Sequence, residues 1–147
     1  MWVDPVIDRS QADVEFANAN RDSSLPLKGA RNHTDLNRIG GNLRHVRDLL
    51  IGLGHSVPEM TSRDNWTMTD IPRESDIDKI RADVAVVRAA EVTLSTTPTV
   101  PTLPLTHYQK LNDIERILLD INELAQKITN TSYRVGEIYV GEKIGVL

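Results

Sequence analysis

The sequence predicts a mainly α-helical protein in which tandem-duplicated helical hairpins form a small bundle, followed by a short C-terminal β tail. One phrase, D-[LI]-[NDE]-[RK]-I-x-x-[ND]-[LVI], occurs three times, beginning at Asp35, Asp76 and Asp113. Apolar residues follow at alternating spacings of three and four, which places them on one helix face. Residues 131–147 instead mix glycines with β-branched and aromatic residues, which predicts one or two short strands.

The chain also repeats on a longer period. The phrase recurs after 41 residues and then after 37, and such periods indicate repeated structural units. Each half of the chain contains, in order, a tryptophan, a helix, a Leu-Pro-Leu loop and a helix that carries the phrase. We therefore interpret residues 1–60 as one helical hairpin, residues 61–130 as a second, and residues 131–147 as a strand tail.

The first two helices have recognisable ends. Ser10 and Asp13 form a capping-box pattern, which predicts a short helix over about 11–20. Thr34 is expected to cap the next helix, and Gly52 is expected to help end it.

The last two helices have similar signals. Ser75 with Asp78 predicts the start of the third helix, and Asn112 with Glu115 predicts the start of the fourth, which should end at Asn130. The apolar stripes predicted to form the core are Leu36, Ile39, Leu43, Val46, Leu50 and Leu53; Ile77, Ile80, Val84, Val87 and Leu94; and Ile114, Ile117, Ile121, Leu124 and Ile128.

Composition limits the size and type of the protein. With 147 residues, 39% of them hydrophobic but only 4% aromatic, the chain can form one domain with a modest aliphatic core or two very small ones. The net charge of −4 and the scattered basic residues give no stripe for nucleic acid. The absence of cysteine excludes disulfides and thiolate sites. No apolar run is long enough to span a membrane.

The sequence contains no pattern typical of catalysis. No phosphate-binding glycine loop or nucleophile motif is present, and the carboxylates are mostly at helix starts. The histidines lack metal-ligand spacing. We therefore expect no enzyme, no cofactor and no metal site.

Gly40 and Gly41 are candidate partner-binding residues. Each glycine inside a helix costs about 1 kcal/mol relative to alanine, so a packing reason is expected. We interpret the pair as a place where another helix or chain approaches the backbone closely.

Trp2 and Trp66 have two possible roles. A tryptophan before a capped helix commonly covers the core, but an exposed one can bind a partner or a host surface glycan. The sequence leaves both roles open.

Three pairs of polar residues, each one helical turn apart, recur in the repeats. They can pair within a solvated helix face, or they can reach across to a neighbouring helix or subunit. The pairs are Arg38 with Asn42, Lys79 with Asp83, and Arg116 with Asp120.

The predicted strand tail supplies the remaining candidates for partner binding, which are Ile138, Tyr139, Val140 and Ile144. An isolated pair of short strands has little stability, so the tail should either fold back on the bundle or extend a sheet of another chain. We favour the second interpretation.

The sequence resembles a group of prophage-encoded structural proteins of Gram-positive bacteria. The resemblance rests on a D-R-[ST]-x-x-D-V run at residues 8–14, a K-G-A turn at 28–30, the D-L-N-R-I helix start at 34–39, the second-half phrases at 65–66 and 75–80, and the Gly-Glu-rich tail. It implies a component of a tail, baseplate or fibre. It also implies assembly in the host cytoplasm into a virion, with other tail proteins and copies of itself as partners. A receptor- or glycan-binding module of a tail fibre is the alternative.

Overall fold

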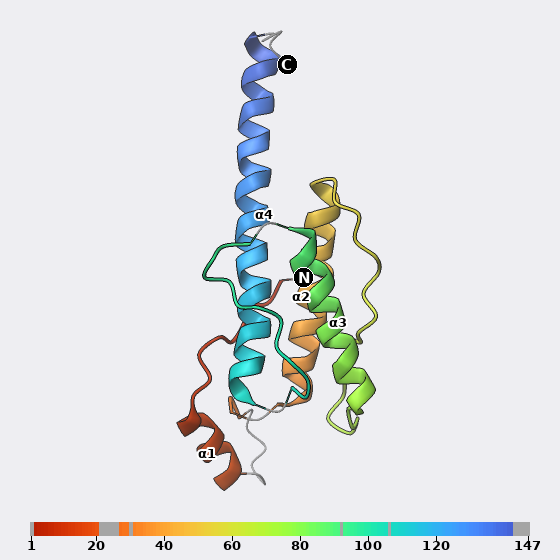
Figure 1. Cartoon of the computed structure of the whole chain (residues 1–147), viewed down its shortest axis with the longest axis vertical. Coiled ribbons are helices and arrows are strands. Elements are labelled where there is room, and N and C mark those ends of the chain that lie inside the picture. The colour runs from red at the N-terminus through yellow and green to blue at the C-terminus, as the bar shows by residue number, and fades with distance from the viewer. Residues whose placement is uncertain (1, 21–26, 30, 92, 106, 143–147) are drawn as a thin grey trace.

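The computed structural model describes residues 2–20, 27–29, 31–91, 93–105 and 107–142, with side chains as far as Asn130. These residues contain no strand, and the mainly α-helical class is confirmed. The helices, shown in Figure 1, are α1 (Gln11–Ala19), α2 (His33–Gly52), α3 (Glu74–Ala90) and α4 (Tyr108–Glu142).

The three long helices form the bundle. α2, α3 and α4 pack against one another in all three pairs. They run in the same direction, and α4 projects from the end at which α2 and α3 finish (Figure 1). Helices in a hairpin would run in opposite directions, so the predicted hairpins are not what the bundle contains. The reason is that the connections are long enough to run back along the bundle before the next helix begins.

α1 lies to the side of the bundle and contributes no residue to its core (Figure 1). Gly29 brings the chain against this helix, since a Cβ at that position would lie 2.2 Å from the backbone carbonyl carbon of Asp13. The three copies of the repeated phrase therefore correspond to the three bundle helices, and α1 is an addition within the first repeat.

The apolar stripes predicted from the sequence form most of the core. Leu94 is an exception, because α3 ends at Ala90 and leaves that side chain 53% exposed. Leu53 and Leu124 are half-buried, and Ile128 is exposed. The buried members of the stripes are Leu36, Ile39, Leu43, Val46, Leu50, Ile77, Ile80, Val84, Val87, Ile114, Ile117 and Ile121.

Three non-helical segments, which we call straps, fill the grooves between the bundle helices. Strap 1 (residues 2–9) contacts α4 and α2, strap 2 (57–66) contacts α2 and α3, and strap 3 (97–105) contacts α3 and α4. Straps 2 and 3 also add apolar side chains to the core. Each repeat is thus a strap followed by a helix.

The first Asp of the repeated phrase closes the helix cap in two repeats. Asn32, not Thr34, caps α2: its side chain accepts from the Asp35 amide at 3.1 Å, and the Asp35 carboxylate accepts from the Asn32 amide at 3.2 Å. Asp76 likewise accepts from the amide of Arg73 at 2.9 Å, so α3 also begins before its predicted start at Ser75. The predicted caps were wrong by about two residues because the phrase itself supplies the third helical position.

α4 differs from its prediction at both ends. It begins at Tyr108, so Asn112 lies inside the helix, and its backbone is helical to Glu142, past the end predicted at Asn130. The side chains beyond Asn130, together with residues 143–147, lie outside what the structure describes. The strand tail predicted for 131–147 is therefore not tested.

Candidate functional site

The repeated Asn or Asp of the phrase holds a strap against its own helix. In the first repeat Asn42 is buried, and its Oδ1 accepts from the amide of Val3 at 2.9 Å while its Nδ2 donates to the carbonyl of Val3 at 2.7 Å. The side-chain amide therefore satisfies both backbone groups of one strap residue.

The same position has the same role in the other two repeats. The buried carboxylate of Asp83 accepts from the amide and hydroxyl of Thr61 at 3.0 and 2.9 Å, and from the amide of Ser62 at 2.7 Å. Asp120 accepts from the hydroxyl of Thr97 at 2.8 Å. In all three repeats, this position binds the strap that precedes its helix.

The two interpretations of the repeated polar pairs each hold in part. Arg116 and Asp120 do pair within their helix, at 3.1 Å. Arg38 instead turns to Asp35 and to a carboxylate of another helix. The neighbours that these positions reach are helices and straps of the same chain.

Two arginines at equivalent repeat positions hold the straps from the other side. Arg47 donates from Nε to the carbonyls of Val57 at 3.2 Å and Pro58 at 2.8 Å. Arg88 donates from Nε to the carbonyl of Pro98 at 2.8 Å. Straps 2 and 3 therefore enter their grooves through the same contact.

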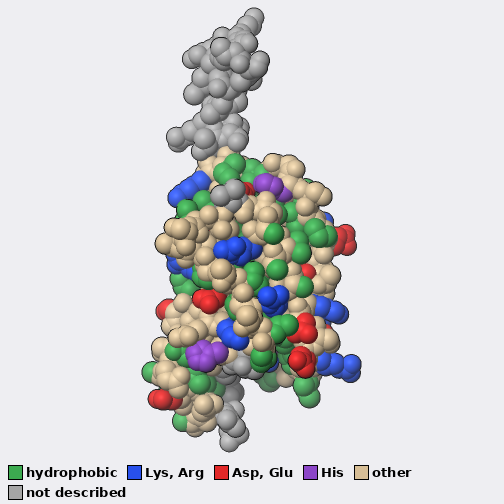
Figure 2. All heavy atoms as spheres, in the orientation of Figure 1, with side chains coloured by type: hydrophobic (Ala, Val, Ile, Leu, Met, Phe, Trp, Pro, Cys, Tyr) green, Lys and Arg blue, Asp and Glu red, His purple; other side chains and the backbone are tan. Residues whose placement is uncertain are grey.

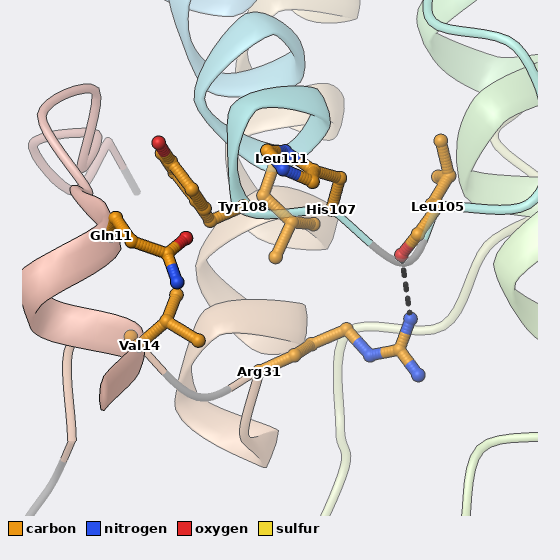
Figure 3. Close-up of a pocket in the computed structure, with 8 residues that line it drawn as sticks. Gln11, Val14, Arg31, Leu105, His107, Tyr108 and Leu111 are labelled. Carbon is orange, nitrogen blue, oxygen red and sulfur yellow. Dashed lines mark hydrogen bonds between the residues drawn. The ribbon is translucent and has the colours of Figure 1, made fainter. Parts of the chain in front are cut away.

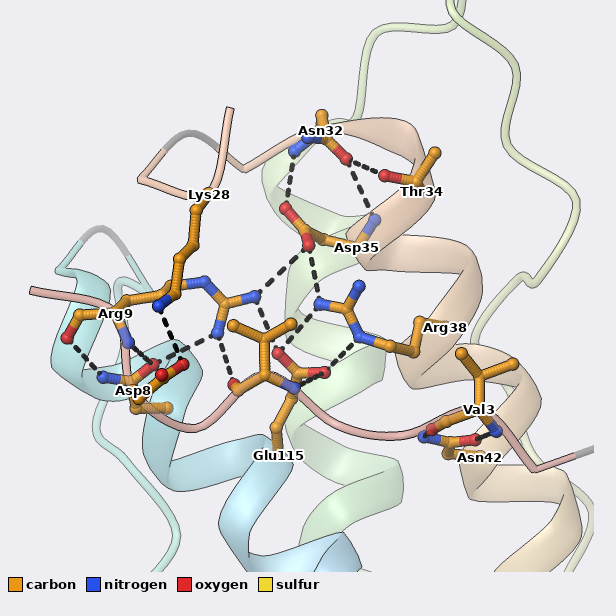
Figure 4. A network of polar contacts seen from close by, with 12 residues as sticks. Val3, Asp8, Arg9, Lys28, Asn32, Thr34, Asp35, Arg38, Asn42 and Glu115 are labelled. Carbon is orange, nitrogen blue, oxygen red and sulfur yellow. Dashed lines mark hydrogen bonds and ion pairs between the residues drawn. The ribbon is translucent and has the colours of Figure 1, made fainter. Parts of the chain in front are cut away.

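A buried network of charges joins strap 1 to α2 and α4 (Figure 4). Arg9 Nη2 lies 2.7 Å from Glu115 Oε2 and 3.3 Å from Asp35 Oδ1, and Arg38 Nη2 lies 2.6 Å from Asp35 Oδ1 and 3.0 Å from Glu115 Oε2. Asn112 adds hydrogen bonds to the backbone of Arg9 at 3.1 and 2.9 Å. Two cations thus face two anions.

The network is electrically balanced. Burial by itself lowers the pKa of Arg38, but hydrogen bonds and charge from Glu115 and Asp35 outweigh that effect and raise the pKa overall. Each of the two arginines contacts both carboxylates, and each carboxylate contacts both arginines. The arrangement suits holding strap 1 in place.

Both tryptophans take part in the fold. Trp66 is only 5% exposed, its amide and carbonyl bond to Asn37 at 2.6 and 2.8 Å, and the guanidinium of Arg63 lies 4.4 Å from its ring centroid. Trp2 is half-buried, with its ring 5.5 Å from that of His45. Trp66 therefore covers the core, as one of its two predicted roles required. Binding of a partner by Trp2 or Trp66 stays a prediction.

The close backbone approach predicted at the paired glycines is made by the same chain. A Cβ on Gly40 would lie 2.7 Å from the carbonyl oxygen of Arg63 and 2.9 Å from the Cβ of Asp64. Gly40 is buried there, and Gly41 beside it is half-buried. An additional partner at these glycines remains a prediction.

The tail residues predicted to bind a partner cannot be placed in a site. The side chains of Ile138, Tyr139 and Val140 lie outside the described part of the chain, and so does all of Ile144. Their role also stays a prediction.

Three exposed apolar residues lie at the end of the bundle from which α4 projects. We call Ile51, Leu94 and Ile128 the apolar collar; they are 43%, 53% and 39% exposed. Figure 2 shows that hydrophobic side chains are scattered among polar and charged ones over the visible face of the bundle. Sequence reasoning assigned Leu94 and Ile128 to the core and overlooked Ile51. The sequence did carry one signal that Ile128 would be exposed: the apolar stripe of α4 is longer than α2 and α3 can cover.

A cavity of about 340 Å³ lies at the other end of the bundle, between α1, the approach to α2, and the start of α4 (Figure 3). Its polar and apolar side chains come from segments far apart in the sequence, so no single motif could have revealed it. The lining residues are Gln11, Val14, Gly29, Arg31, Leu105, His107, Tyr108 and Leu111.

The described residues also lack two features that would indicate a metal-binding or membrane-spanning protein. They hold no cluster of three or more histidine or carboxylate side chains able to bind a metal ion. None of their helices combines the length and apolar character needed to cross a membrane. In comparisons with known proteins, no family model, no curated protein and no solved structure matches this chain.

Proposed function

We propose that this protein is a non-enzymatic structural component of a bacteriophage or phage-like tail, in the baseplate, fibre or neck region. It would be made in the host cytoplasm and built into the virion, where it joins other tail proteins and copies of itself. The assignment to a tail rests on the resemblance of residues 8–14, 28–30 and 34–39. The mode of assembly rests on the apolar collar and the projecting part of α4.

The collar is the observation that carries the assembly proposal. Single exposed aliphatic side chains are ordinary on soluble proteins. Here Ile51, Leu94 and Ile128 come from three different segments and lie at the same end of the bundle. Exposed apolar residues at one end of a bundle can serve as an interaction site; the opposite end also carries two, Met68 and Ile71, which are 79% and 86% exposed. A partner seated on the collar would bury all three of its residues.

The length of α4 indicates that a partner binds at this same end of the bundle. Its 35 residues span about 50 Å, whereas the 20 residues of α2 span about 30 Å. An isolated helical segment is marginal in water without tertiary packing. The part of α4 beyond the bundle therefore needs a partner, whether it meets that partner as a helix or, as the sequence predicts for 131–147, as strands.

The interior of the bundle favours a structural role over the alternative of glycan binding. The buried charges of Arg9, Asp35, Arg38 and Glu115 pair with one another. Trp66 has almost no exposed ring surface for a sugar. The groups most often used for catalysis or for sugar stacking are thus committed to the fold.

Light scattering after size exclusion tests the assembly proposal. We would compare the full chain with a truncation after Asn130 and with Ile128→Glu. The matched control is Ile71→Glu, since Ile71 is 86% exposed but precedes α3, at the opposite end of the bundle. We expect the full chain and the control to form the same defined oligomer, and the other two to be folded monomers.

Mass spectrometry of purified particles tests the tail assignment separately. The protein should be present in intact virions of the source prophage after induction. A chain that is monomeric in every form and absent from particles would overturn the proposal. An oligomer that is absent from particles would preserve the assembly surface but not the tail role.

A further inference from the structure

The cavity beside α1 has the chemistry of a ligand site, and it is independent of the tail assignment. We propose that it binds a small organic carboxylate, with the charged group at Arg31 and the apolar body against Val14, Leu105 and Leu111. Its volume of about 340 Å³ falls in the range of small-molecule sites, which is roughly 300–1,000 Å³.

The guanidinium of Arg31 supplies the anion-binding group. Its one partner among the described residues is the carbonyl oxygen of Leu105, at 3.2 Å (Figure 3). A guanidinium carries five N–H donors in a planar fork, which fits both oxygens of a carboxylate. Most of these donors therefore remain available to a ligand.

The charge of Arg31 is not balanced by an acid. Arg31 is exposed to solvent beside the cavity, whereas the buried Arg9 and the half-buried Arg38 each face a carboxylate. No ion pair joins Arg31 to a carboxylate in the described part of the chain. Neighbouring protein atoms still remove part of the hydration of Arg31, and this partial desolvation lowers its pKa. A bound anion would relieve that cost.

The floor of the cavity selects for an apolar body. Leu105 and Leu111 are buried at 3% and 7% exposure, and Val14 of α1 faces them across the cavity (Figure 3). Tyr108 lines the same space, and its ring stacks with that of His107 at a centroid distance of 4.6 Å. Aliphatic and aromatic carbon thus lines part of the space next to the cation, beside the polar groups of Gln11 and His107.

The rim adds directional donors. His107 Nδ1 accepts from the amide of Gln109 at 3.2 Å, which places the ring proton of the neutral imidazole on Nε2. Gln11 contributes a side-chain amide from α1. These groups can orient a ligand, whereas Arg31 alone supplies the charge.

Three probes separate charge from apolar contact in the full-length protein. Benzoate has a carboxylate and a ring, benzyl alcohol has the ring without the charge, and acetate has the charge without the ring. Binding would be followed by amide shifts in two-dimensional NMR during titration. We expect benzoate to bind at least about ten-fold more tightly than either of the other probes, with the largest shifts at Val14, Arg31 and Leu111.

The variant Arg31→Gln tests the cation. It should weaken benzoate binding about ten-fold or more and leave the weak binding of benzyl alcohol unchanged. Lys79→Gln is the matched control, because Lys79 is an exposed cation on α3. Its loss should change the binding of neither benzoate nor benzyl alcohol. If Arg31→Gln failed to fold, the comparison of the three probes on the native protein would still decide the question.

Three results would overturn the proposal. The first is equal binding of benzoate and acetate, because the apolar floor would then contribute nothing. The second is benzoate binding with shifts confined to residues away from the cavity. The third is no binding of benzoate at millimolar concentration.

Discussion

Exchanging the Asn and Asp of the repeated phrase should destabilise the protein even though the sequence repeat treats them as equivalent. Asp83 receives only donors: the amide and hydroxyl of Thr61 at 3.0 and 2.9 Å, and the amide of Ser62 at 2.7 Å. In Asp83→Asn the new NH2 group must replace one acceptor oxygen. The best orientation keeps the oxygen on Thr61 and turns the NH2 toward the buried Ser62 amide, where two donors then meet.

The expected loss follows from that geometry. One hydrogen bond to a charged acceptor contributes about 1.5–3 kcal/mol, and a buried donor left without a partner costs about 1–3 kcal/mol. These effects overlap, so Asp83→Asn should lower the free energy of unfolding by about 2–4 kcal/mol. That is a large share of the roughly 5–15 kcal/mol typical of a whole domain.

The reverse exchange should fail for the opposite reason. Asn42 accepts from the amide of Val3 and donates to its carbonyl at 2.7 Å. Asn42→Asp would place a carboxylate oxygen against that carbonyl, so two acceptors would meet. Because Val3 is itself half-exposed and can shift, we expect a smaller loss of about 1–3 kcal/mol.

Urea denaturation followed by circular dichroism measures both exchanges. Asp48→Asn is the control, because Asp48 is exposed on α2 and should change the free energy of unfolding by less than about 0.5 kcal/mol. Hydrogen exchange should show that the Ser62 amide loses protection in Asp83→Asn. If both exchanges matched the control within about 0.5 kcal/mol, the assignment of this position to holding the straps would be refuted.

Three other outcomes are expected. Gly40→Ala should lower the free energy of unfolding by about 1–3 kcal/mol, because its Cβ would lie 2.7 Å from a backbone oxygen; Gly52→Ala, where no atom lies within 4 Å, should not lower it in the same urea titration. Arg9→Met should lower the free energy of unfolding by about 3–5 kcal/mol, because two buried carboxylates lose a partner. A loss under about 1 kcal/mol would contradict this role of Arg9. Hydrogen bonds from the amide and hydroxyl of Ser10 lower the pKa of Asp13 below its unfolded-state value of 3.8. The stability that this cap adds to α1 is therefore fully present above pH 3.8, and it is lost as the pH falls through the pKa of Asp13 in the folded protein. The Ser10 amide shift in NMR should titrate only in that acid range, and Asp13→Asn should abolish the titration; a midpoint at or above pH 3.8 would contradict it.

The packing of the bundle helices was predictable from the sequence because it depends on periodicity. Ile39, Ile80 and Ile117 occupy the same place in the phrase, and all three are buried in one core. A spacing of three and four fixes which residues share a helix face, and that face must be covered. The direction of the helices has no such signature, since the same stripes serve parallel and antiparallel packing.

The contacts of the straps were not predictable for a different reason. Asn42 and Asp83 bind backbone groups, and every residue except proline presents the same amide and carbonyl. Their partners Val3 and Thr61 therefore carry no complementary side-chain pattern. A spacing of one helical turn suggested pairing with Arg38 or Lys79 instead, because that is the interaction such spacing usually allows.

The cavity could not be predicted because α1 stands outside the repeat. Val14 and Arg31 meet Leu111 only through the way the first repeat places its additional helix. The charged network has a similar origin: Arg9 belongs to strap 1, 26 residues from Asp35. Long-range contacts of this kind depend on the arrangement of the straps, which the sequence pattern leaves undetermined.

The arrangement of repeats also accounts for the projection of α4. In the first two repeats, an arginine twelve residues after the first Asp, Arg47 or Arg88, receives the strap that follows its helix. The equivalent residue of the third repeat is Ala125, which is buried and has no group to receive a strap. The groove that a following strap would enter, between α4 and α2, is already filled by strap 1 through Arg9 and Asn42. The described chain after Ala125 therefore finds no free groove between the bundle helices, and α4 continues outward.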